Sequence, residues 1–85
     1  MAQKIMVVDD DPAMLKLACT TLRMRGFEVV TACNGLEAVQ KVNAERPDLI
    51  VMDVNMPEMD GITALGHIKQ APASRDIPIL IISSL

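Results

Sequence analysis

Acidic residues follow two short apolar runs of the chain. Asp9, Asp10 and Asp11 come directly after residues 5–8, and Asp53 comes directly after a second such run. A carboxylate that follows a buried strand lies at the carboxyl end of that strand, where open α/β sheets hold their ligands. If the two strands are neighbours, these carboxylates converge on one crevice and raise each other's pKa unless a cation joins them. The residues therefore predict a site for a hard divalent ion such as Mg2+ beside a reactive aspartate.

Two serines, Ser83 and Ser84, follow a further apolar run at 79–82. A hydroxyl at a strand end can donate a hydrogen bond to an oxyanion such as phosphate. An aspartate beside Mg2+ can itself be phosphorylated, because aspartyl phosphates are an established product of nucleophilic catalysis. The metal would neutralise charge on the transferring group and help to align the reactants.

Each of these residues also has an ordinary structural interpretation. A single aspartate at a strand end is more often a helix cap or a turn residue, and Asp11 is interpreted as the cap before Pro12. Asn55 can form an Asx-turn, and Pro57 can stiffen the same loop. Ser83 can be an ordinary strand-end residue. The combination and its spacing, rather than any one residue, indicate a functional site.

The elements that would position these residues alternate along the chain. Asp11 before Pro12 predicts a helix start, Gly26 predicts its end, and Asn34 with Glu37 resembles a capping box. The expected strands are 5–8, 27–32, 49–52 and 79–82. Each of the three expected helices has an apolar stripe. The stripe is Met14, Leu17, Ala18 and Leu22 in the first helix, Leu36, Val39 and Val42 in the second, and Ile62, Leu65 and Ile68 in the third. Leu15 and Met24 lie off the first stripe and are either surface residues or part of an interface. This order predicts an α/β fold, a doubly wound parallel sheet with helices on both faces.

Composition narrows the class of protein. The 85 residues suffice for one small domain. Of these residues 51% are hydrophobic, but Phe27 is the single aromatic one, so the core is expected to be aliphatic and methionine-rich. The net charge of −3 and the lack of a basic run argue against direct binding to nucleic acid or an anionic membrane. Cys19 and Cys33 lack metal-site or redox spacing and are expected to be buried or half-buried free thiols in a reducing cytoplasm. No apolar run has transmembrane length.

Three stretches together resemble the receiver domain of two-component response regulators. They are Val-Val-Asp-Asp-Asp at 7–11, Asp-Val-Asn-Met-Pro-Glu-Met-Asp-Gly at 53–61, and Ile-Pro-Ile at 77–79 leading to Ser83 and Ser84. The resemblance extends from Lys4 to Leu85. It implies a flavodoxin-like fold, and the strand order 2-1-3-4-5 of chemotaxis receivers is taken over from it rather than derived.

The resemblance also implies a role for each site residue. Asp53 would accept a phosphoryl group from a phosphohistidine on a sensor histidine kinase or a histidine phosphotransfer protein. Asp10, Asp53 and the backbone carbonyl of Asn55 would bind Mg2+ directly, and Asp9 would complete the acidic pair through a water molecule. Ser83 would be the switch hydroxyl that turns toward the phosphoryl group. Ser84, beside it, matches the small residue that leaves room at the site.

The same resemblance predicts that residues 1–85 form a receiver domain without its last helix–strand–helix portion, which leaves four strands and three helices. The missing strand would carry a lysine that pairs with the phosphoryl group, and the lysines present (Lys4, Lys16, Lys41 and Lys69) fall at a strand start or along helices. The run 79–82 would then be an apolar edge strand. A domain-swapped or edge-paired homo-oligomer is the expected consequence.

Two other functions compete with a phosphoacceptor switch. One is a Mg2+-dependent phosphohydrolase with an aspartyl-phosphate intermediate, but such enzymes usually have a second carboxylate two residues after the nucleophile, where this chain has Asn55. The other is an inactive fragment that only assembles into an oligomer. The phosphoacceptor is expected to catalyse at most its own phosphorylation and dephosphorylation, and not to act as a metabolic enzyme.

Overall fold

The strands and helices alternate along the whole described chain, as the sequence predicts. The computed structural model describes residues 3–53, 61–72 and 74–82, apart from the side chains at 61, 62 and 64. The elements are β1 (Lys4–Val8), α1 (Pro12–Met24), β2 (Glu28–Ala32), α2 (Gly35–Glu45), β3 (Leu49–Asp53), α3 (Gly61–Gln70) and β4 (Ile79–Ile82). Among the described residues no helix is both long and apolar enough to cross a membrane.

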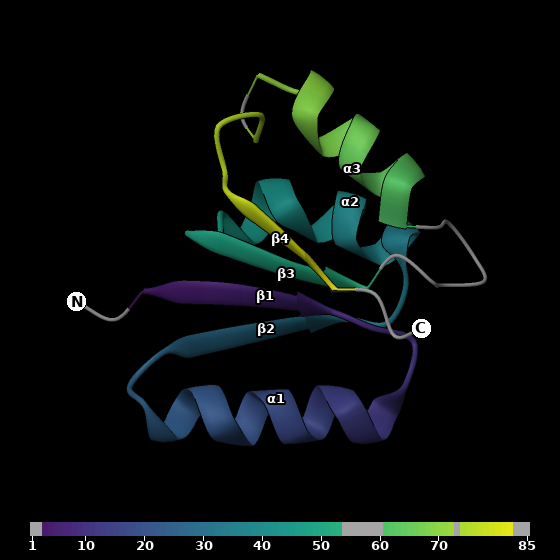
Figure 1. Ribbon diagram of the computed structural model, residues 1–85. Coiled ribbons are helices and arrows are strands. Elements are labelled where there is room, and N and C mark those ends of the chain that lie inside the picture. Colours follow the sequence, from purple (N-terminus) through teal and green to yellow (C-terminus); the bar gives the residue numbers. More distant parts are fainter. Residues whose placement is uncertain (1–2, 54–60, 73, 83–85) are drawn as a thin grey trace.

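The four strands form one parallel sheet in the order β2-β1-β3-β4. β1 therefore lies between β2 and β3, as Figure 1 shows. Val8, the last residue of β1, is in register with Ala32 on one side and Met52 on the other. The carboxyl ends of these three strands are thus level, and the residues that follow them meet at one edge of the sheet. The fold and strand order predicted from the sequence are confirmed.

The helices cover both faces of the sheet, with α1 on one face and α2 and α3 on the other (Figure 1). Successive residues of a strand point to opposite faces. The side chains of Met6, Val8, Ile50 and Met52 accordingly pack with α2 and α3 residues in one core cluster. Ile5, Val7 and Val29 pack with α1 in a second cluster. Every buried side chain of β1 belongs to one of these clusters, so the core holds β1 in place from both faces.

The apolar stripe predicted for α1 is partly wrong. Met14 and Leu17 are 49% and 60% exposed, whereas Leu15 and Cys19, together with Ala18 and Leu22, pack on the sheet. The helix turns the face with spacing i, i+3, i+4, i+7 inward, and that face begins at Leu15. The prediction combined residues from this face with residues from the adjacent outward face. Met24 is 82% exposed, as expected for a residue off the stripe.

A similar correction applies to α2. Leu36 is 46% exposed, while Ala38 and Val42 are buried in the core. The small side chain of Ala38 gave no strong apolar signal in the sequence. Leu36 lies two positions before Ala38, which is about 200° around the helix axis, so it points outward when Ala38 faces the core.

β4 is the last strand of the described sheet, and its apolar side chains after Ile79 are open to solvent. Leu80, Ile81 and Ile82 are all about half exposed, at 55%, 43% and 48%. Leu80 is in register with Val51, and Ile82 is in register with Asp53. The expected apolar edge strand is confirmed within the described part of the chain.

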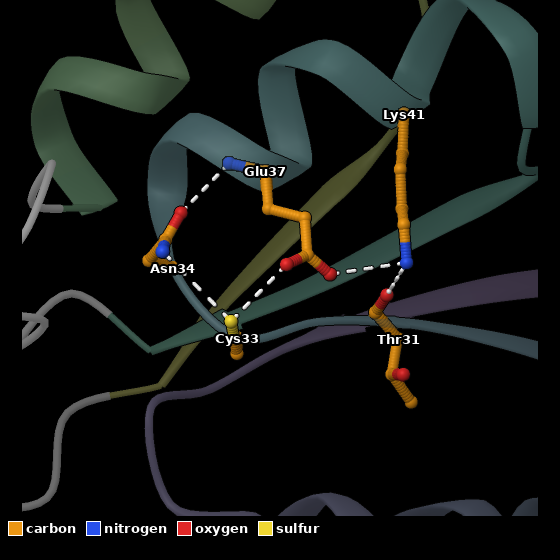
Figure 2. Close-up of polar contacts among 5 residues, drawn as sticks. All are labelled: Thr31, Cys33, Asn34, Glu37 and Lys41. Atoms are coloured by element: carbon orange, nitrogen blue, oxygen red, sulfur yellow. Dashed lines mark hydrogen bonds and ion pairs between the residues drawn. The ribbon is translucent and has the colours of Figure 1, made fainter.

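The junction between β2 and α2 is held by a group of polar contacts (Figure 2). The side chain of Asn34 caps α2 by accepting a hydrogen bond from the Glu37 N–H at 2.7 Å. The Glu37 carboxylate does not close the expected capping box; it accepts a hydrogen bond from the Cys33 thiol at 3.1 Å and pairs with Lys41 at 3.0 Å. Lys41 also donates to the carbonyl of Thr31 at 2.7 Å. These contacts join the first turn of α2 to the end of β2.

Cys33 corrects one further expectation. Both cysteines are free, but only Cys19 is half-buried, and Cys33 is exposed. Cys33 follows the last residue of β2, and at that point the chain has left the sheet.

Candidate metal centre

Three carboxylates meet at the carboxyl edge of the sheet. Asp9 and Asp10 follow β1, and Asp53 is the last residue of the adjacent strand β3. Each of them offers one oxygen atom, and these oxygens all lie within 4.8 Å of one another. The level ends of β1 and β3 cause this convergence, as the positions of the acidic residues in the sequence predict.

Asp9 is held at both its backbone and its side chain. Its N–H donates to the carbonyl of Ala32 at 3.1 Å, which ties it to the end of β2. Its carboxylate oxygen Oδ1 accepts a hydrogen bond from the backbone N–H of Asp11 at 3.0 Å. Asp11 in turn caps α1, as predicted, because its Oδ1 accepts from the N–H of Ala13 at 3.0 Å. The backbone of Asp9 is therefore tied to β2, and its side chain is tied to the start of α1.

The electrostatics of the cluster favour a cation. Partial burial raises the pKa of Asp9 above its ordinary value, and the neighbouring carboxylates of Asp53 and Asp10 raise it further. The hydrogen bond from the Asp11 N–H works in the opposite direction and lowers this pKa. A divalent cation between the three carboxylates would remove the repulsion. Hard oxygen donors of this kind suit Mg2+, so the donor set fits the ion predicted from the sequence.

Several residues assigned from the sequence lie outside the described part of the chain. These are Asn55, Pro57, Ser83 and Ser84. Their expected roles as carbonyl ligand, loop residue, switch hydroxyl and small neighbour stay predictions.

Three of the four lysines bind elsewhere in the fold. Lys4, at the opposite edge of the sheet, contacts the carbonyl and carboxylate of Glu45 at 3.0 and 3.4 Å. Lys41 belongs to the β2–α2 junction, and Lys69 donates to the carbonyls of Arg75 and Ile77 at 3.0 and 2.9 Å. Lys16 is an exposed residue of α1. In the described chain, then, three lysine side chains already have carbonyl partners, all away from Asp53.

A cleft beside the carboxylates did not emerge from the sequence. It has a volume of about 320 Å3, and its lining includes Asp9 and Asp53 as well as Met14, Leu17 and Ile82. It lies between α1 and the side of the sheet that α1 covers, and its α1 wall includes Ala18 and Leu22 of the sheet-packed face, so its walls are mainly apolar. Its lining comes from α1 and three strands that are distant in the sequence, so spacing along the chain does not reveal it.

Comparison with known proteins gives a consistent result. The family model described as the response regulator receiver domain matches residues 5–85. The chain is 50% identical over 78 residues to the chemotaxis protein CheY of Bacillus subtilis, covering 91% of this chain and 65% of that protein. It is 39% identical to the alkaline phosphatase synthesis transcriptional regulatory protein PhoP of Bacillus subtilis, covering 99% of this chain and 34% of that protein.

A solved structure agrees with the fold. The chemotaxis response regulator CheY4 of Vibrio cholerae superposes with a TM-score of 0.91 at 34% identity, covering 95% of this chain and 68% of that one. The chain thus spans between about a third and two thirds of the length of the curated relatives described above.

Proposed function

This chain belongs to the response regulator receiver family, and we propose that it acts as a phosphoacceptor switch in two-component signalling. In this proposal Asp53 accepts a phosphoryl group from a phosphohistidine in the presence of Mg2+. The observation that carries the proposal is the cluster of Asp9, Asp10 and Asp53, with one oxygen from each within 4.8 Å of the others at the edge of the sheet.

The site residues divide into two groups by role. Asp10, Asp53 and the backbone carbonyl of Asn55 would hold Mg2+ directly, with Asp9 bound to it through a water molecule. When bound, the ion would supply charge neutralisation for the phosphoryl oxygens. The hydroxyl group of Ser83 would donate a hydrogen bond to a phosphoryl oxygen. The close approach of Asp9 and Asp10 to Asp53 supports the assignment of the metal ligands, because it concentrates negative charge where the ion would bind.

The transfer itself needs one nucleophile and one leaving group. An oxygen of the ionised Asp53 carboxylate would attack phosphorus, the bond between phosphorus and the histidine nitrogen would break, and the histidine would leave with that electron pair and take up a proton. The carboxylate must be ionised and aligned for this step. A rival phosphohydrolase would need a proton-transferring carboxylate two residues beyond Asp53, where this chain has Asn55.

The partner on the input side would be a sensor histidine kinase or a histidine phosphotransfer protein. The relatives include a chemotaxis protein and a transcriptional regulatory protein, so receivers of this family are used in more than one kind of response. We further propose that residues 1–85 act together as one receiver domain. A cytoplasmic location would suit the two free thiols, Cys19 and Cys33.

The test is the intact mass of the protein after incubation with acetyl phosphate and Mg2+. A gain of one phosphoryl group that is lost in Asp53→Asn and in EDTA would support the proposal. A folded protein that gains no mass would favour the alternative of an inactive oligomer-forming fragment. Repeated turnover of a generic phosphate ester would favour the hydrolase.

A further inference from the structure

The start of α1 and the orientation of Asp9 depend on the same residue, Asp11. Its backbone N–H donates to Oδ1 of Asp9 at 3.0 Å, while its own Oδ1 accepts from the N–H of Ala13 at 3.0 Å. Its carbonyl accepts the first hydrogen bond of the helix, from the N–H of Leu15 at 3.0 Å. Asp11 thus makes three hydrogen bonds, one toward the carboxylate cluster and two into the helix.

The backbone of Asp11 has little freedom to move away from Asp9. A residue before proline is restricted to extended conformations, and Asp11 precedes Pro12 with φ −95° and ψ 112°. Its side-chain cap fixes the same turn from the helix side, because Ala13 N–H would otherwise lose its partner. The Asp11 N–H is therefore aimed at Asp9 by constraints that come from α1.

We propose that Asp11 is a positioning residue for the metal centre: by capping α1 it holds its own N–H against Asp9 and so orients that carboxylate toward Asp10 and Asp53. The inference rests on the proposed function, since it assumes that the cluster binds Mg2+. Asp11 is not among the three residues whose oxygens lie within 4.8 Å of one another, so it acts through Asp9. Hydrogen bonds to metal-binding side chains commonly set their orientation in this way.

Three variants separate the cap from the charge of Asp11. Asp11→Asn, Asp11→Ser and Asp11→Ala all remove the same negative charge, so each loses the same long-range attraction for a cation. Asparagine and serine keep an oxygen that can cap the helix, and alanine does not. A difference between alanine and the other two variants therefore reports on the cap.

Asn34→Ala is the matched control for loss of a helix cap. Asn34 caps α2 through an equivalent contact, at 2.7 Å to the N–H of Glu37, and it is not a member of the carboxylate cluster. Its removal should lower the melting temperature about as Asp11→Ala does, but without releasing Asp9. It shows what a purely structural loss does to metal binding.

The experiment measures the dissociation constant for Mg2+ of each variant by NMR titration, well below its melting temperature. We expect Asp11→Ala to bind Mg2+ more weakly than Asp11→Asn and Asp11→Ser by about tenfold, the lower end of the range for partners of metal-binding side chains. Asn34→Ala should bind like the wild type. Equal affinities for the three Asp11 variants, or an equal loss in Asn34→Ala, would overturn the positioning role. A wild-type protein with no saturable Mg2+ binding would instead overturn the proposed function.

Discussion

The thiol of Cys33, an exposed cysteine, donates a hydrogen bond to Oε2 of Glu37 across 3.1 Å. This contact raises the pKa of Cys33 above the ordinary thiol value and lowers the pKa of Glu37 below the ordinary carboxyl value. The thiolate is the reactive form of cysteine. Near neutral pH, Cys33 should therefore react more slowly than an exposed cysteine whose pKa is not raised.

Glu37→Gln should make Cys33 react faster with iodoacetamide at mildly alkaline pH. The substitution removes the negative charge that disfavours the thiolate, so the pKa of Cys33 should fall toward its ordinary value. Rates measured against pH in a Cys19→Ser background follow this one thiol. A pH profile that stays in place after the substitution would show that Glu37 does not control the ionisation of Cys33.

The same contact predicts a small dependence of stability on acid pH. The pKa of Glu37 is lowered first by the Cys33 thiol and then by Lys41, so its folded-state pKa lies below its unfolded-state pKa. The stabilisation is therefore present above the unfolded pKa and is lost as the pH falls through the folded one. At pH 7 the free energy of unfolding in urea should be higher for the wild type than for Glu37→Gln, by less than about 1 kcal/mol. The difference should disappear in acid, and a constant difference at all pH values would contradict this account.

Asp9→Asn should stabilise the protein in EDTA. The pKa of Asp9 is raised, chiefly by burial. Its ionised form therefore destabilises the folded state at neutral pH, and this destabilisation is lost as the pH falls through the raised pKa. Since Asp9 is only partly buried, the gain should be below about 1 kcal/mol, equivalent to no more than about 8 °C in Tm. The variant should also lose part of the rise in Tm that Mg2+ gives the wild type. Thermal denaturation with and without Mg2+ measures both effects, and a lower Tm for Asp9→Asn in EDTA would refute the argument.

An isolated chain of residues 1–85 should self-associate through the exposed edge of β4. Leu80→Lys places a charge on this edge strand, where Leu80 is more than half exposed, and charged edge residues oppose pairing between sheets. We expect the wild type to show a concentration-dependent increase in molecular mass by light scattering and Leu80→Lys to remain monomeric. Met24→Lys is the control, because Met24 is more exposed still but lies in α1. A wild type that is monomeric at all concentrations would contradict the prediction.

The sequence predicted the carboxylate cluster well because strand ends are local signals. Continuous apolar runs followed by Asp9 and Asp53 define two strand ends, and a parallel sheet brings such ends to one edge. The neighbouring position of β1 and β3 follows from the family resemblance alone, since local signals do not fix strand order. The structure confirms that order.

The faces of the helices were harder to predict. Two adjacent apolar rows run along α1, one containing Leu15 and the other containing Met14 and Leu17, and only packing on the sheet decides which row is inward. The cleft next to Asp9 and the partner of Cys33 were missed for the same reason. Both depend on side chains brought together by tertiary structure, which spacing along the chain does not show.

The central position of β1 also bears on how the protein folds. Ile5 pairs with Val29 on one side and with Leu49 on the other, and the neighbouring contact of Lys4 with Asp48 joins residues 44 positions apart. Contacts between such distant residues slow folding, because a long loop must close before they form. Asp9 directly follows β1 and Asp53 ends β3, so the two halves of the metal centre should come together in the step that pairs these two strands, and not afterwards.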